Sequence, residues 1–247
     1  MRSPLLAPAR RIFELALGEM LWARRAVFMA LAAGAPVLLA VVTRLALTSG
    51  TAVLSINGGQ VDSETMFGTA ISVLYLRFIV PALGVFYGTS LIADEVEDKT
   101  ITYLFTRPIA RGAIVLGKYL AYLLCVLSVI LPSVALVFTV MVPFRDMGTL
   151  FGTLTSDLGV IALGLAAYGA VFLWAGLLFR RPLVGGLIFV FGWEQVALVL
   201  PGYLGRLTIA YYLQTETVSV ATLIVVTVAA VFFAMRTIER REYVLEQ

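Results

Sequence analysis

Long apolar stretches separated by short polar ones are the dominant pattern of this chain. A helix needs about 20 mostly apolar residues to cross the hydrocarbon core of a bilayer, and six stretches qualify. They cover approximately residues 26–47, 71–93, 113–142, 158–179, 183–200 and 218–235. Pro36, Pro81 and Pro132 lie inside these stretches and predict kinks. We therefore expect an all-α, polytopic membrane protein with six transmembrane helices in a single domain over residues 1–247.

The longest polar interruption between two apolar stretches covers residues 94–118. Acidic residues come first, a short apolar helical pattern follows, and Pro108 ends it. Negative charge in the first turn and a basic residue after the last turn both complement the helix dipole. This pattern predicts a short amphipathic helix at the membrane surface, well placed to dock in a groove on a soluble partner. The alternative is an ordinary cytoplasmic loop with a solvated charged face.

Two further segments have interfacial character. In residues 10–25, apolar side chains fall on one face of a helix with Arg11, Glu14 and Gly18 opposite, which predicts a helix lying flat at the membrane surface. Residues 201–217 are too apolar for a free loop, and their tyrosines suit the headgroup level. They are typical of a re-entrant or interfacial segment. The alternatives are a simple anchor for the first segment and an interfacial loop packed on its neighbours for the second.

Composition supports a membrane protein and indicates its orientation. The 247 residues are 61% hydrophobic and 13% charged, with a mean hydropathy of +0.98, whereas soluble domains are roughly 25% charged. The Lys and Arg residues gather in the N-terminal arm, the second and fourth loops and the tail, and the exceptions are Arg44, Arg77, Arg145 and Arg206. By the positive-inside rule, both termini and the 94–118 loop are cytoplasmic. The net charge of +3 follows from this topology and does not argue for a nucleic-acid partner.

Ionisable residues inside the spans are candidates for function because each is costly in hydrocarbon. Arg44 lies close to the outer end of the first span and can snorkel to water. Arg77 and Glu194 lie at similar depth in the second and fifth spans. We expect these two to pair or to line a polar cavity, since either one alone would cost several kcal/mol. A structural ion pair and a substrate contact are both compatible with this pattern.

Residues for catalysis or for metal binding are sparse. The chain has no histidine, which excludes His-dependent zinc sites and Ser-His pairs. The single Cys125 excludes an intrachain disulfide. Gly112, Gly117 and Lys118 match the spacing of a phosphate-binding loop, but Tyr119 follows where Ser or Thr is required and no strand precedes. We therefore expect no enzyme activity, no cofactor and no metal site in this chain.

The residues after the second apolar stretch resemble the loop that follows the second span in ABC type-2 permeases. The matching positions are Glu97, Asp98, Lys99, Thr100, Ile101, Leu104, Phe105, Arg107, Pro108, Ile109, Ala110, Arg111, Gly117 and Lys118. The usual sequence motif in that family is an acid, Gly-Thr, a pair of leucines, Pro-Ile-Ser-Arg, and a Lys that enters the third span. This chain has Lys99 where Gly is common and Ala110 where Ser is common.

The resemblance implies the membrane subunit of an ABC transporter without an ATPase domain of its own. Residues 94–111 would then be the coupling loop that contacts a separate cytoplasmic ATPase subunit, and ATP and Mg would bind to that partner. The coupling residues implied in this way are Glu97, Ile101, Leu104, Phe105, Pro108 and Arg111. Residues 10–25 would be the elbow helix, and residues 201–217 would correspond to the extracellular helices that close the outer side of the pathway.

The resemblance also implies a homodimer or heterodimer of permeases, surrounded by membrane lipid in the cytoplasmic (inner) membrane of a bacterium or an archaeon. An apolar bundle with few internal charges suits the export of a lipid, a hydrophobic drug or a peptide. Two other classes remain open. An ATP-independent transporter or channel would favour more intramembrane polar groups and an inverted repeat. A membrane anchor would recruit a soluble factor through the same loop.

Overall fold

The computed structural model describes residues 13–18, 25–49, 55–56, 59–60, 63–97, 111–179, 181–199, 204–214 and 219–240. Almost all of these residues are helical, and the two strands form a short antiparallel pair of two residues each. Besides the helical residues 13–18, the elements are α2 (Arg25–Thr48), β1 (Ser55–Ile56), β2 (Gly59–Gln60), α3 (Ser63–Thr69), η1 (Ala70–Ile79), α4 (Val80–Glu97), α6 (Arg111–Met141), α7 (Met147–Leu178), α8 (Pro182–Ile188), η2 (Phe189–Glu194), α9 (Gln195–Val199), η3 (Leu204–Leu207), α10 (Ile209–Gln214) and α11 (Val220–Arg240).

Five helices of the described chain are long and apolar enough to cross a membrane. They are Ala26–Thr48, Glu64–Ile92, Gly112–Met141, Met147–Leu178 and Val220–Arg240. These agree with five of the six predicted spans. The remaining predicted span, 183–200, coincides with a shorter apolar helix, Pro182–Ala197, formed by α8, η2 and α9.

The helix α7 begins at Met147, well before the predicted span at 158–179. The reason lies in the apolar spacing of this segment, because Leu150, Leu154 and Leu158 recur at intervals of one helical turn. Leu154 is buried, so the helix gains core contacts well before the apolar run begins. Polar residues between these leucines masked the pattern in the sequence.

Pro81 does not break the second span. Proline lacks an amide hydrogen and cannot continue the regular α-helical hydrogen-bond ladder. The ten residues before α4 form the π-helix η1, and the Val80 N–H donates a hydrogen bond to the carbonyl oxygen of Tyr75. The wider turns of this π-helix accommodate the backbone hydrogen bond that Pro81 cannot make, at the position where a kink was predicted. Pro36 and Pro132 lie inside α2 and α6, which continue through them.

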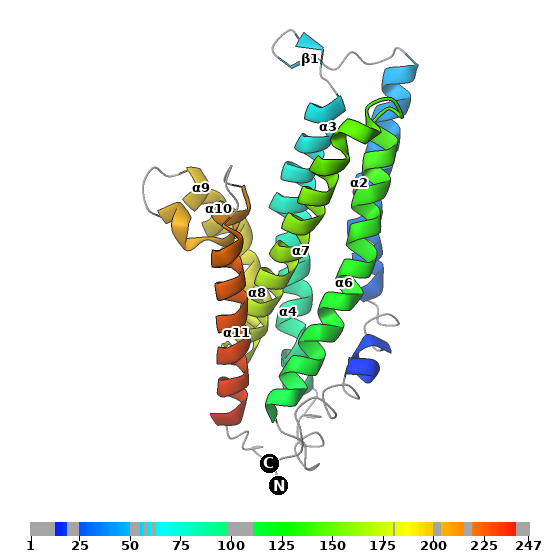
Figure 1. The fold of residues 1–247 in the computed structure, drawn as a ribbon. Helices are drawn as coiled ribbons and strands as arrows, with labels where there is room; N and C mark the ends of the chain where they lie inside the picture. The colour runs from blue at the N-terminus through cyan, green and yellow to red at the C-terminus, as the bar shows by residue number, and fades with distance from the viewer. Residues whose placement is uncertain are drawn as a thin grey trace.

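The helix α7 lies at the centre of the bundle (Figure 1). It packs against α4, α6 and α11, while α2 packs on the outer side of α6. Toward one end of the molecule lie the ends of α4, α7 and α11 and the starts of α2, α6 and α8 (Figure 1). The small β1–β2 pair lies at the other end. This arrangement agrees with antiparallel neighbouring spans.

Glycines bring α4 and α7 into close contact. An added Cβ at Gly88 would lie 2.9 Å from the carbonyl oxygen of Gly169, and one at Gly176 would lie 2.7 Å from that of Thr89. Gly84 faces Tyr168 at a similarly close approach. Small residues at helical spacing allow two membrane helices to pack backbone against backbone. The two helices therefore form a tight pair in the middle of the bundle.

Candidate functional site

The end of the bundle that carries the α4–α6 connection contains a buried cation. Lys118 is 8% exposed, and its Nζ donates a hydrogen bond to the carbonyl oxygen of Leu91 over 2.9 Å. Leu91 lies near the end of α4 and Lys118 near the start of α6, so this bond joins the two helices just inside their connection. Displacing one of these helix ends would therefore displace the other.

The start of α6 is buried on several sides. Ala113, Ile114 and Val115 are at most 2% exposed. Gly112 lies against the end of α11, where an added Cβ would be 3.6 Å from Glu239 Oε1 and 3.7 Å from Met235. The connection thus leads into a packed junction of α4, α6 and α11 rather than into a free helix end.

The implied coupling residues lie on or between α4 and α6. Glu97 is the last residue of α4 and Arg111 is the first residue of α6, so the two helices bring these positions to the same end of the bundle (Figure 1). Ile101, Leu104, Phe105 and Pro108 lie outside the described residues, as does most of the predicted 94–111 coupling loop. Their role stays a prediction.

Glu194 is fully buried in η2, and its carboxyl group accepts hydrogen bonds from α7 and α10. The hydroxyl of Tyr168 in α7 donates to Oε2 over 2.6 Å, and the N–H of Ile209 in α10 donates to Oε1 over 3.1 Å. Both carboxyl oxygens are therefore hydrogen-bonded, as a buried polar group requires. The side chain joins the central helix α7 to the short helix α10, which belongs to the segment predicted to be re-entrant or interfacial.

Arg77 and Glu194 form no ion pair within the described residues. In the same part of the chain, the buried Nε of Arg77 has no hydrogen-bond partner. Glu194 instead binds Tyr168 and the backbone of Ile209, which satisfy its carboxyl group without a cation. The alternative that both side chains line a polar cavity stays a prediction.

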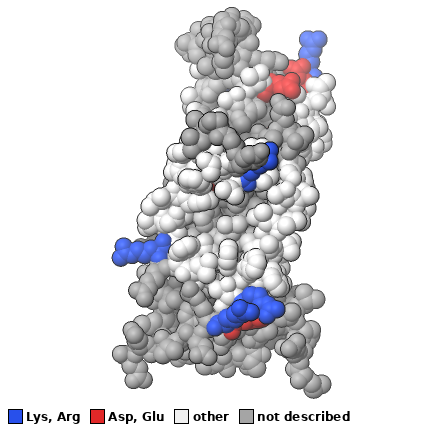
Figure 2. All heavy atoms as spheres, turned by 90° about the vertical axis from the view of Figure 1, so that its left-hand side faces the viewer, with Lys and Arg blue, Asp and Glu red and all other residues white. Residues whose placement is uncertain are grey.

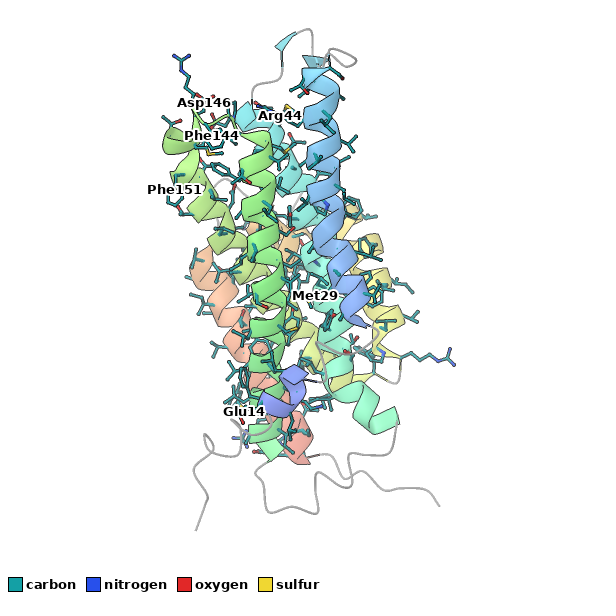
Figure 3. All side chains as sticks on the ribbon, turned by 90° about the vertical axis from the view of Figure 1, so that its right-hand side faces the viewer. Glu14, Met29, Arg44, Phe144, Asp146 and Phe151 are labelled. Carbon is teal, nitrogen blue, oxygen red and sulfur yellow. The ribbon has the colours of Figure 1, made fainter. Side chains whose placement is uncertain are left out.

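Arg44 lies where the sequence predicted it, toward one end of α2. Figure 3 shows it near Phe144 and Asp146, at the end of the molecule opposite Glu14. Its Nη1 approaches the carbonyl oxygen of Met141 at 3.5 Å, at the long limit of a hydrogen bond. This position suits an arginine that snorkels to the membrane surface.

Tyrosine hydroxyls join the helices elsewhere in the core. Tyr75 in η1 shares a 2.7 Å hydrogen bond with Ser133 in α6, whose hydroxyl donates to the carbonyl oxygen of Ala33 in α2 over 2.6 Å. Tyr119 and Tyr122 in α6 donate to carbonyl oxygens of α7 over 2.9 and 3.0 Å. None of these residues, nor Tyr168, was predicted from the sequence. The signal was available, because a phenol inside a span needs a polar partner.

The described part of the chain contains no group of three or more His, Cys, Asp or Glu side chains that could hold a metal ion. On the face shown in Figure 2, charged side chains lie above and below a band that has none. A bundle of long apolar helices with this distribution of charge is a multi-pass membrane protein.

The family follows from a comparison of the sequence. A family model described as "ABC-2 family transporter protein" matches residues 18–209, and the chain belongs to this family. The match extends from before α2 to the start of α10. No curated protein matched the chain in a further comparison. The protein is accordingly the membrane permease of an ABC transporter, a system that includes an ATPase partner.

Proposed function

We propose that this chain is the permease subunit of an ATP-driven exporter and that a separate cytoplasmic ATPase binds its α4–α6 connection. The observation that carries the proposal is the family match, which includes this connection and both helices that flank it. In this proposal both termini face the cytoplasm, and the permease works as a homodimer or heterodimer in the inner membrane. ATP and Mg bind to the partner.

Each coupling residue has a role that suits its chemistry. The apolar side chains of Ile101, Leu104 and Phe105 fill a groove on the ATPase. Glu97 and Arg111 determine the register of docking through their charges. Pro108 ends the short helix, because it cannot donate the next backbone hydrogen bond.

The movement passes from the coupling loop into the bundle through rigid contacts. The bond from Lys118 to Leu91 keeps the ends of α4 and α6 together, and the glycine contacts keep α4 against α7. A force on the loop would therefore shift α4, α6 and α7 as one body. Rigid-body motion of this kind suits alternation between inward and outward states. The transported molecule in this proposal is a hydrophobic lipid, drug or peptide.

The decisive test is a pull-down from solubilised membranes. The chain carrying both Leu104→Asp and Phe105→Asp is compared with the unmodified chain and with a matched double variant, Leu204→Asp and Leu207→Asp. Leu204 and Leu207 are 39% and 72% exposed in η3, next to α10 and away from the α4 and α6 ends. Bound soluble proteins are identified by mass spectrometry.

The proposal predicts that an ATPase co-purifies with the unmodified chain and with the η3 variant, and that the Leu104/Phe105 variant loses it while remaining folded. Retention of the ATPase by all three would remove the coupling role of these residues. If no ATPase is bound by any of them, an ATP-independent transporter or a membrane anchor becomes the better proposal.

A further inference from the structure

A cavity of about 600 Å³ lies between the end of α7 and the start of α8. Its walls are almost entirely apolar, and its residues follow helical spacing along both helices. The residues that matter for the argument are Phe172, Trp174, Phe179, Arg181, Gly185 and Phe189. The volume is in the range of sites that bind small molecules.

Gly185 leaves this cavity open. A Cβ added at Gly185 would meet no atom within 4 Å, although the residue lies in the wall of the cavity. The neighbouring Gly186 is different, because its added Cβ would lie 2.9 Å from Val85 and 3.0 Å from Phe172. Gly186 therefore allows α8 to pack closely against Val85 and Phe172, whereas the missing side chain of Gly185 leaves part of the cavity unfilled.

Arg181 is the charged residue in the wall of the cavity. It lies between the end of α7 at Leu178 and the start of α8 at Pro182, so it stands where the chain leaves and re-enters the apolar layer. Its side chain is exposed, and within the described residues no ion pair or hydrogen bond involves its guanidinium. A guanidinium in this position is suited to a phosphate, to which it can donate two parallel hydrogen bonds.

We propose that this groove binds an anionic phospholipid, with the headgroup phosphate at Arg181 and one acyl chain between α7 and α8. An apolar cavity of this kind excludes water. In a membrane, acyl chains are the apolar material available to fill it, and van der Waals contacts with the walls of the groove hold the chain. Basic pockets between helices near the membrane surface bind anionic headgroups for the same reason. This lipid is a bound component rather than the transported molecule, so the site is independent of the exporter proposal.

Trp174 offers a direct probe because it lies in the wall of the cavity. Fluorescence quenching by dibrominated lipids reports which acyl chains contact a tryptophan. A protein with Trp174 alone is made with Trp22→Phe and Trp193→Phe, and a protein with Trp193 alone is made with Trp22→Phe and Trp174→Phe. Trp193 is 41% exposed and lies outside the cavity wall, so it reports the surrounding lipid. Both are reconstituted in phosphatidylcholine vesicles containing brominated phosphatidylglycerol or brominated phosphatidylcholine.

We expect Trp174 to be half-quenched at about a fivefold lower fraction of the anionic lipid than of the neutral one, the ratio that one basic residue near the surface provides. Trp193 should show no such preference. Arg181→Gln should abolish the preference at Trp174, and Gly185→Phe should reduce the quenching itself. Gly192→Phe is the matched control, since Gly192 lies in the same apolar helix, is exposed and is not in the wall.

Equal quenching of Trp174 by both lipids would overturn the proposal, as would quenching that Gly185→Phe leaves unchanged. If neither lipid quenches Trp174, protein such as a second copy of the chain covers the groove. This outcome too would overturn the proposal. A second measurement avoids the tryptophan replacements. Mass spectrometry of the detergent-purified protein should find bound anionic phospholipid on the unmodified chain and on Gly192→Phe, and should find it depleted on Gly185→Phe.

Discussion

Glu194 illustrates how single residues hold this bundle together. The carboxyl group has no exposed surface, and a phenol and a backbone amide bind it within the described structure. Neither donor can be identified from the sequence alone, because the two partners lie 26 and 15 residues away on other helices. Burial without these donors would cost several kcal/mol, so the contacts of Glu194 determine where α10 lies.

Tyr168→Phe should lower the stability of the protein by about 1 kcal/mol, because it removes one donor from a buried carboxyl group and leaves the ring in place. The measurement is thermal unfolding in detergent, followed by the loss of the monodisperse peak on gel filtration. Tyr212→Phe is the control, since no hydrogen bond of the Tyr212 hydroxyl is recorded within the described residues. Equal effects of the two replacements would contradict the role assigned to Tyr168.

Lys118→Met should separate stability from partner binding. Methionine preserves most of the apolar length of the side chain but cannot donate to the carbonyl oxygen of Leu91, which loses its 2.9 Å bond. We expect a loss of about 1–2 kcal/mol in unfolding measurements, while the ATPase still co-purifies from solubilised membranes. Loss of the ATPase with unchanged stability would instead mean that Lys118 contacts the partner.

Among the elements, the pair formed by α4 and α7 is the most dependent on small residues. Gly84, Gly88 and Gly176 permit backbone contacts that no larger side chain allows. Gly159, also on α7, has no neighbour within 4 Å of an added Cβ. Glycine is therefore required for close packing at Gly176, whereas at Gly159 on the same helix a larger side chain would fit.

Gly176→Ala should destabilise the protein by about 1–3 kcal/mol, since the added methyl group would lie 2.7 Å from the carbonyl oxygen of Thr89 and would push α4 away. Gly159→Ala should be neutral or stabilising by up to about 1 kcal/mol, because alanine favours the helix and meets open space. Thermal unfolding of both variants in the same detergent checks this. Similar behaviour of the two would show that the α4–α7 contact is looser than described.

Helices were predictable from the sequence where the thickness of the membrane imposes their length. They were less predictable where packing against other helices determines their bounds. Long apolar runs identified five helices because the hydrocarbon core requires about 20 residues. The early start of α7 was missed because its apolar residues are spaced by turns and not in a run. The π-helix before Pro81 and the donors to Glu194 depend on tertiary contacts, which a pattern along one chain does not contain. The coupling loop was inferred from its motif alone and stays a prediction.

At the scale of the whole molecule, the antiparallel order of the helices makes a prediction about membrane sides. Phe144, in the α6–α7 connection, is 91% exposed and lies opposite Glu14 in Figure 3. Glu239 is exposed near the end of α11, which lies with the ends of α4 and α7 (Figure 1). Cytoplasmic termini require these two positions to face opposite compartments.

Labelling with a membrane-impermeant thiol reagent tests this topology in a Cys125→Ala background, which removes the single native cysteine. Phe144→Cys should react in intact cells, whereas Glu239→Cys should react only after the membrane is permeabilised. The reverse pattern would invert the orientation, and the loop between α4 and α6 could then not meet a cytoplasmic ATPase.

The continuous helical segment formed by α8, η2 and α9 covers Pro182–Val199 and is shorter than the neighbouring spans. At 1.5 Å per residue these described residues extend about 27 Å, slightly less than the roughly 30 Å of a typical hydrocarbon core. The bilayer beside it must thin or the helix must be tilted less than its neighbours, at a cost of fractions of a kcal/mol per Å of mismatch. Lipids with shorter acyl chains relieve that cost. The side of the protein that contains the α7–α8 groove is thus also the side that favours a thinner membrane.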